Sequence, residues 1–191
     1  MDEAAADAVF RLLRRSGIAI GPGLSPEEFE HAERTFALRF PPDLRLLLGR
    51  GLPIGPKFPA WRTASDKHLR EMIRWPLDGI LFEVRAREFW PRAWGRRPRD
   101  YAAAKRIASA AVAVAPALVP VYSHRYLPSE PYEAGNPVLS VYQSDVAYYG
   151  RNLSEYFANE FGSPRTPPIV TEVGRIRFWS DLAEGTVDRD E

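Results

Sequence analysis

Apolar residues at helical spacing open the chain and predict a first helix over residues 3–15, which Ser16-Gly17 ends. The positions that carry this prediction are Ala5, Ala8, Val9, Leu12 and Leu13. A second helix begins at a capping box, because Ser25 is followed by Pro26 at the first helical position and by Glu28 three residues after the cap. Its apolar face, predicted to pack inward, consists of Phe29, Ala32 and Phe36.

Proline and glycine divide the following residues into short elements. Pro41-Pro42 ends the second helix, and a short helix is predicted over residues 43–48. Residues 52–65 form a Gly- and Pro-rich loop, and a further short helix over residues 66–73 is expected to end before Pro76.

Short apolar runs with turn residues between them dominate the later half. Strands that share one sheet are predicted at residues 80–85, 118–122, 138–142 and 146–149, the last two as a hairpin across Gln143-Ser144. Two more helices are predicted, one over residues 99–113 and one that Asn152 caps. Residues 175–179 fit either an edge strand or a helical turn, and the acidic tail over residues 185–191 is expected to be disordered.

Length and composition are those of one globular domain spanning residues 1–191, and the predicted helices and strands place it in the α+β class. Of the 191 residues, 45% are hydrophobic and 27% charged, which excludes a disordered chain. The absence of cysteine excludes disulfides, thiolate nucleophiles and iron–sulfur clusters. The acidic start does not resemble a signal peptide, and the longest apolar run, residues 108–118, is too short to cross a bilayer. A cytoplasmic protein without membrane partners is therefore expected.

Positive charge is concentrated in one segment although the net charge is only +1. Residues 85–106 contain eight basic residues against Glu88 and Asp100, a local net charge of +6, so the other residues sum to −5. Arginine greatly outnumbers lysine, which suits carboxylate pairing and aromatic stacking or else reflects a GC-rich coding sequence. A basic run of this kind is most often a solvated face. If it binds a partner, an acidic surface fits it better than nucleic acid does, because the whole chain lacks a strong positive field.

Residues 24–55 resemble the N-terminal signature of the SUKH superfamily, named partly for the yeast Smi/Knr cell-wall-synthesis regulators. The shared pattern is a helix carrying a glutamate, here Glu33, followed by proline and a short apolar helix that ends at glycine. Later segments resemble a bacterial, largely actinobacterial branch, and the match covers residues 20–162. These segments are Phe58–Arg62, Gly79–Val84, Phe89–Gly95, Leu118–Pro128 and Pro137–Gly150.

The resemblance implies an α+β fold in which N-terminal helices pack on a mainly antiparallel sheet. In bacteria it implies protein binding, often by immunity proteins that neutralise polymorphic toxins, and it implies no catalysis. The chain departs from the pattern at Ala60, where an acidic residue is expected, and at Gly49-Arg50-Gly51, which replaces Asn-Gly.

The candidate chemistry centres on histidine. His31, His68 and His124 do not have metal-ligand spacing, so neither a metal nor a cofactor is predicted. His124 and Asp145 could pair across neighbouring strands near Ser123, Ser140 or Ser144, but no Gly-x-Ser-x-Gly elbow surrounds a serine. No catalytic residue is therefore predicted. Pairing of Arg125 with Asp145 is the favoured structural alternative, and Glu33 is expected to have a structural role as well.

Aromatic residues beside arginines have either of two roles, core packing or anchoring a protein partner. The predicted partner-binding residues, expected to converge on one side of the sheet, are Trp61, Arg62, Trp90, Trp94, His124, Arg125 and Tyr126. The favoured function is a non-catalytic protein-binding module, most specifically an immunity protein whose partner is a toxin domain. A general cytoplasmic interaction or regulatory protein is the first alternative, and a hydrolase or a nucleic-acid binder ranks below both.

Overall fold

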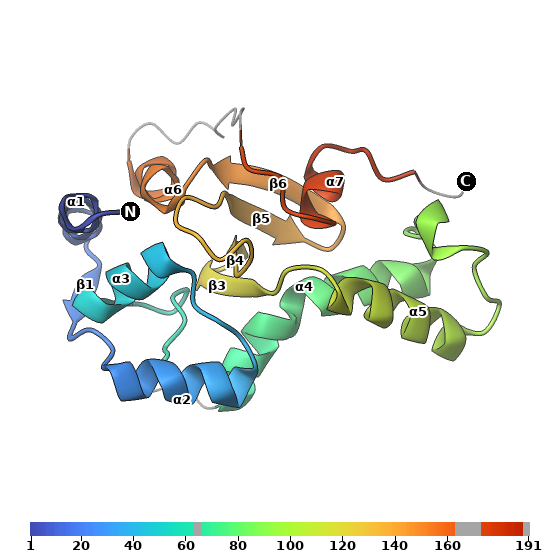
Figure 1. Ribbon diagram of the computed structural model, residues 1–191, viewed down its shortest axis with the longest axis horizontal. Coiled ribbons are helices and arrows are strands. Elements are labelled where there is room, and N and C mark those ends of the chain that lie inside the picture. The colour runs from blue at the N-terminus through green and yellow to red at the C-terminus, as the bar shows by residue number, and fades with distance from the viewer. Residues whose placement is uncertain (63–65, 163–172, 189–191) are drawn as a thin grey trace.

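The computed structural model, which describes residues 1–62, 66–162 and 173–188, is built around an antiparallel sheet (Figure 1). Neighbouring strands follow the chain order, β3 (Leu118–Tyr122), β4 (Arg125–Pro128), β5 (Val138–Tyr142) and β6 (Asp145–Gly150). A smaller antiparallel pair joins β1 (Ala19–Gly21) to β2 (Leu52–Ile54). The predicted α+β class is confirmed.

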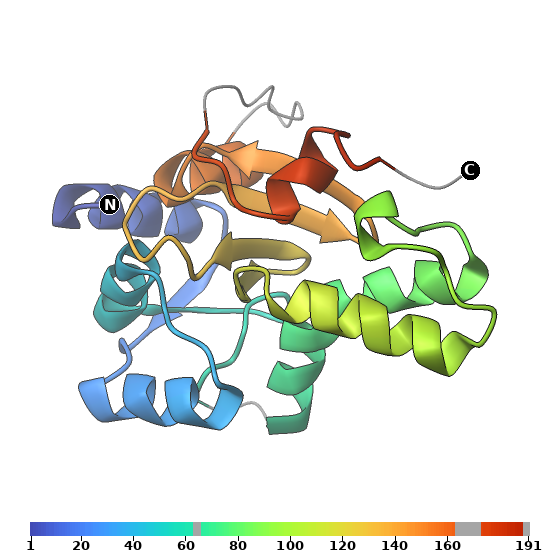
Figure 2. The ribbon, with the colours of Figure 1, turned by 45° about the vertical axis from the view of Figure 1, so that its right-hand side comes forward.

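Helices surround the main sheet, and α1 to α5 precede it along the chain (Figures 1 and 2). The α-helices are α1 (Glu3–Arg15), α2 (Pro26–Phe36), α3 (Pro42–Arg50), α4 (Asp66–Ala86), α5 (Tyr101–Ala113), α6 (Leu153–Phe161) and α7 (Trp179–Ala183), with a 3-10 turn η1 (Arg92–Trp94) between α4 and α5. Helices α1 and α6, far apart in sequence, lie side by side.

The main sheet has a hydrophobic core on each face. In β3, Leu118 packs into one cluster and Val119 into the other, and Tyr126 and Leu127 of β4 divide in the same way. Successive side chains of a strand point to opposite faces, so both faces are buried. Helices α1, α2, α3 and α6 cover the first face, and α4, α5 and α7 cover the second. This differs from the common antiparallel sheet that has one face in water.

The capping box predicted at the start of α2 is confirmed. Ser25 Oγ accepts a hydrogen bond from the Glu28 N–H at 3.3 Å, and the Glu28 carboxylate accepts one from the Ser25 N–H at 2.8 Å. Phe29 and Ala32 are buried as predicted, while Phe36 is only partly buried. The boundaries predicted for α1 are also confirmed, as is the hairpin formed by β5 and β6.

The prediction of a short helix over residues 66–73 followed by a strand at residues 80–85 is wrong. The segment is one 21-residue helix with Pro76 inside it. Proline has no N–H, so the carbonyl of Met72, four residues earlier, loses its usual helical donor. The Tyr126 hydroxyl donates to that carbonyl at 2.9 Å. The hydrogen bond satisfies the freed oxygen and ties α4 to β4, a strand that the sequence reading treated as loop.

Helix α4 packs closely on the turn between β5 and β6. A Cβ on Gly79 would lie 2.9 Å from Gln143 Cα and 3.0 Å from Gln143 N, closer than carbon atoms tolerate. Glycine is therefore required where the helix backbone meets the hairpin turn. The turn residue Gln143 has a positive φ of 59°. Ser123, in the turn between β3 and β4, also has a positive φ, of 52°.

Main-chain hydrogen bonds connect the C-terminal segment after α7 to the rest of the chain. The Thr186 N–H donates to the Asp181 carbonyl at 2.9 Å, and the Arg92 N–H donates to the Asp188 carbonyl at 2.8 Å. The disorder expected for residues 185–191 stays a prediction, and residues 189–191 lie outside the described residues. Among the described residues, no helix is long and apolar enough to span a membrane.

Candidate binding cleft

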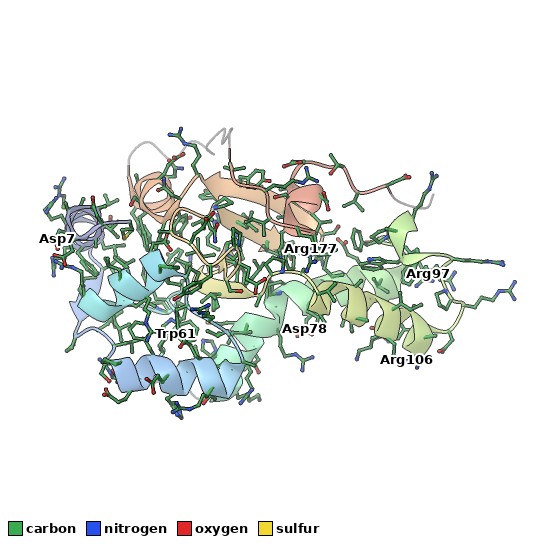
Figure 3. All side chains as sticks on the ribbon, in the orientation of Figure 1. Asp7, Trp61, Asp78, Arg97, Arg106 and Arg177 are labelled. Carbon is green, nitrogen blue, oxygen red and sulfur yellow. The ribbon has the colours of Figure 1, made fainter. Side chains whose placement is uncertain are left out.

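A cleft of about 670 Å³ lies between α4 and the turns of the two hairpins of the main sheet. Residues 123–124, in the turn between β3 and β4, form part of its wall with Tyr142 at the end of β5. Helix α4 contributes His68, Trp75 and Asp78, the last of which is labelled in Figure 3. We call this the α4 cleft.

One stripe of α4 is exposed and aromatic. Residues 68, 71, 75, 78 and 82 alternate spacings of three and four, which places them on one helical face, and all five are exposed. Trp75 is 47% exposed and Phe82 is 59% exposed, and Tyr142, which lies beside Trp75, is 54% exposed. The rings of Trp75 and Tyr142 lie 6.2 Å apart between centroids. Large rings left this open by a folded chain are available for contact with another molecule.

Contacts between separate elements hold the cleft walls in place. The Ser123 N–H donates to the Lys57 carbonyl at 2.7 Å and so joins the loop after β2 to the first hairpin turn. The Tyr126 hydroxyl bond fixes β4 to α4. The close approach of Gly79 fixes α4 to the second hairpin turn. A binding surface on such a framework is already formed before a ligand arrives.

The charges around the α4 cleft largely cancel. Glu71 lies 4.0 Å from Lys67, and Asp78 lies 3.2 Å from Arg74, both as exposed pairs one helical turn apart. Lys57 places its ammonium 5.8 Å from the Tyr122 ring centroid. Aromatic surface, more than net charge, is therefore what this cleft offers a ligand.

His124 is the half-buried histidine of the cleft. Its Nδ1 lies 3.2 Å from Ser123 Oγ. Burial lowers the pKa of its imidazole below 6.5, and the neighbouring charges of Arg125 and Lys57 lower it further. A neutral imidazole beside a hydroxyl can accept a proton, but among the described residues no hydrogen bond joins it to an orienting carboxylate. Asp145, the predicted pairing candidate, is exposed at the start of β6.

Trp61 and Arg62, predicted as partner anchors, are used within the fold. Trp61 is partly buried, with its ring 4.8 Å from that of Phe40, and Figure 3 shows it near α2 and α3. Arg62 donates to both carboxylate oxygens of Glu28, at 2.5 and 2.7 Å, and also to the carbonyls of Pro22 and Gly23. Its hydrogen bond lowers the pKa of Glu28 from 4.5 to about 2. Arg62 therefore ties the start of α2 to the residues that precede it by hydrogen bonds.

Trp90, Trp94 and Tyr126 pack in the second core, away from Trp61. Trp90 is buried and donates its indole N–H to the Gly95 carbonyl at 2.7 Å, while Trp94 packs edge-on against it at 5.3 Å. Tyr126 is 1% exposed. The predicted convergence of all these aromatic residues on one side of the sheet is wrong, because their large apolar surfaces complete two different cores.

The predicted pairing of Arg125 with Asp145 is also wrong. Arg125 is buried and lies 3.3 Å from Glu160 of α6, with its guanidinium 3.9 Å from the Tyr149 ring centroid. It also donates to Ser140 Oγ at 2.9 Å. Glu33, expected to be structural, accepts from the Phe40 N–H and from Arg45, each at 3.0 Å. These two polar sets connect elements and do not face the cleft.

Trp75, Phe82 and Tyr142 are exposed aromatic residues that were not among the predicted partner-binding residues. A signal for the first two was present, since Leu69, Ile73, Ile80 and Val84 continue one apolar helical stripe through Pro76. A helix read through that proline places Trp75 and Phe82 on a face away from the stripe. Of the predicted anchors, only His124 and Tyr126 lie in the cleft wall.

Within the described residues there is no group of three His, Cys, Asp or Glu side chains that could hold a metal ion. Comparison of the chain with protein-family models, curated proteins and solved structures gives no match.

Proposed function

We propose that the chain is a non-catalytic protein-binding module that holds its partner at the α4 cleft. The observation that carries this proposal is the exposed Trp75–Tyr142 pair, whose ring centroids lie 6.2 Å apart in the wall of a formed cleft. Tryptophan and tyrosine are the side chains that most often dominate the binding energy of protein interfaces. A near-neutral charge balance around them favours burial against a partner's apolar side chains.

The partner we propose is a toxin domain that the chain neutralises as an immunity protein. The resemblance of residues 20–162 to the SUKH superfamily supports this choice, and so does an α+β fold with helices before the sheet. A general interaction or regulatory role would use the same cleft. The products of genes adjacent to the one that encodes this chain distinguish the two roles, because an immunity protein is inherited with its toxin.

The test is co-expression of the chain with the products of its neighbouring genes, followed by affinity capture. Trp75→Ala and Tyr142→Ala should each lower the affinity for a captured partner by about 2 kcal/mol, roughly thirtyfold. The matched control is Tyr132→Ala, since Tyr132 is also exposed, at 41%, and does not line the α4 cleft. Circular dichroism of each variant verifies that it is folded.

Two outcomes would overturn the proposal. One is capture of a partner whose affinity is unchanged in both cleft variants, which would place the interface elsewhere. The other is hydrolysis of an activated ester by the purified chain that disappears in Ser123→Ala, because the Ser123–His124 contact would then be catalytic.

A further inference from the structure

The end of the molecule farthest from α1 carries a dense group of exposed basic side chains. It is formed by the end of α4, the connection through η1 and the first half of α5 (Figures 1 and 3, the latter labelling Arg97 and Arg106). We call its exposed members the basic tip, namely Arg85, Arg87, Arg96, Arg99, Lys105 and Arg106.

Within the described residues, ion pairs do not neutralise the charges of the basic tip, in contrast to several other arginines of the chain. Arg50, Arg62 and Arg175 each form an ion pair with a carboxylate at 3.3 Å or less. Within the described residues, no member of the tip forms an ion pair, and Arg85 instead lies 5.8 Å from the Tyr101 ring centroid. Residues 85–106 keep a net charge of +6. Such a local field attracts an anionic partner.

The backbone beneath the tip is firmly held. Arg97 donates to the Val84 carbonyl at 2.6 Å, and Trp90 donates to the Gly95 carbonyl at 2.7 Å. Asp100 caps α5 by accepting from the Ala103 N–H at 2.8 Å. The backbone positions that carry the basic side chains are therefore set before a ligand binds, which reduces the backbone entropy lost on binding.

An acidic residue of the chain, Asp188, already lies at the margin of this surface. Asp188 accepts a hydrogen bond from the Arg92 N–H through its main-chain carbonyl at 2.8 Å, and its carboxylate lies 3.3 Å from the Arg92 guanidinium. Recognition of a main-chain carbonyl together with the carboxylate of the same residue is suited to a peptide. A phosphate backbone matches only the charge.

We propose that the basic tip docks an acidic segment of a partner protein, and that Asp188 competes for the margin of this surface from within the chain. We choose an acidic peptide as the occupant because Asp188 already binds Arg92 through its main-chain carbonyl and its carboxylate. The residues outside 85–106 have a net charge of −5, which disfavours a long polyanion such as nucleic acid. The proposal is independent of what the α4 cleft binds.

The experiment measures fluorescence anisotropy of a fluorescein-labelled poly-glutamate peptide titrated with the full chain at low salt. Arg96→Glu combined with Arg99→Glu should weaken binding at least tenfold, and added salt should weaken binding to the unchanged chain. The matched control combines Arg11→Glu with Arg15→Glu, an equal change of charge at exposed positions of α1. Its affinity should stay within twofold. Asp188→Asn should tighten binding about threefold, since it weakens the internal competitor.

Equal loss of affinity in the tip variant and the α1 control would overturn the proposal, because binding would then follow net charge alone. Tighter binding of a labelled DNA duplex than of poly-glutamate would replace the acidic protein segment by nucleic acid. Unchanged affinity of Asp188→Asn would overturn the competitive role. If the double glutamate variant is unfolded by circular dichroism, Arg99→Gln combined with Arg106→Gln serves in its place, with the same direction expected. Loss of capture in the cleft variants bears only on the proposed function.

Discussion

His124 lies at the border between the α4 cleft and the buried strand β4. Its ring is half-buried, and both Arg125 and Lys57 oppose a positive charge on it. The folded protein therefore favours the neutral imidazole, with a pKa below the ordinary 6.5. In the unfolded chain the same ring binds a proton more readily, so protonation favours unfolding.

We predict that His124→Gln reduces the acid sensitivity of folding. Well above pH 6.5 the ring is neutral in both states and contributes no pH dependence, whereas as the pH falls toward and below 6.5 the unfolded state binds more protons and stability falls. The variant should lose less stability than the unchanged chain between about pH 7 and pH 5, as measured by urea unfolding at each pH. His31→Gln, at an exposed position of α2, is the matched control. Equal pH profiles for the unchanged chain and His124→Gln would contradict the prediction.

Single residues also show where sequence reasoning about the site ends. Composition marks tryptophan, tyrosine and arginine as anchors or as core, and only the fold decides between these roles. Trp90 and Tyr126 pack in the second core, and Arg62 forms hydrogen bonds with Glu28. Trp75 and Tyr142, in contrast, remain exposed. The difference depends on contacts between residues far apart in the chain, which no local pattern contains.

Helix α4 is the element on which the candidate site depends. It supplies the aromatic stripe of the cleft, and it passes through Pro76 because the Tyr126 hydroxyl satisfies the carbonyl of Met72. The ring of Tyr126 is buried, and its hydrogen bond to Met72 is partly buried at the cleft wall, where an unpaired carbonyl still costs free energy. A distant strand thus replaces the hydrogen bond that proline removes.

We predict that Tyr126→Phe destabilises the chain by about 1–3 kcal/mol, because it leaves the Met72 carbonyl without a donor. Pro76→Ala restores an N–H four residues after Met72. In that background Tyr126→Phe should therefore cost about 1 kcal/mol less, a coupling that a double-mutant cycle by urea unfolding measures. If Tyr126→Phe has the same effect in both backgrounds, the hydroxyl does not stand in for the helical N–H.

The elements that could be predicted are those whose signals are local. The capping box of α2, the apolar stripe of α1 and the two-residue turn between β5 and β6 all lie within a few residues. Helix α4 was divided at Pro76 because the compensating donor is Tyr126, 50 positions later in the sequence. Strands β1 and β2 were missed because each has three residues, too few for a periodic signal.

At the scale of the whole molecule, the central sheet connects two cores. Leu127 of β4 is fully buried in the first and Leu139 of β5 in the second. Neighbouring strands therefore contribute to both cores at once, and loss of either core removes support from the same sheet.

We predict that the chain unfolds as a single cooperative unit, as expected for one domain. Leu127→Ala and Leu139→Ala should each cost about 2–5 kcal/mol. For the unchanged chain and both variants, urea transitions followed by far-ultraviolet circular dichroism and by tryptophan fluorescence should coincide. The fluorescence reports mainly the second core, because Trp90 and Trp179 are buried there. A circular dichroism transition of Leu127→Ala that precedes its fluorescence transition would show two separately folding units.

The packing of α1 against α6 affects how the chain folds during synthesis. The apolar face of α1 includes Val9, Phe10 and Leu13, and part of its cover comes from α6, which begins at Leu153. About 140 residues separate the two helices, so at roughly 5–20 residues per second the ribosome needs about 7–30 seconds to reach α6. During that interval α3 and β1 shield α1 only in part. The nascent chain therefore exposes part of the apolar face of α1 until α6 has been synthesised, a surface of the kind that chaperones bind.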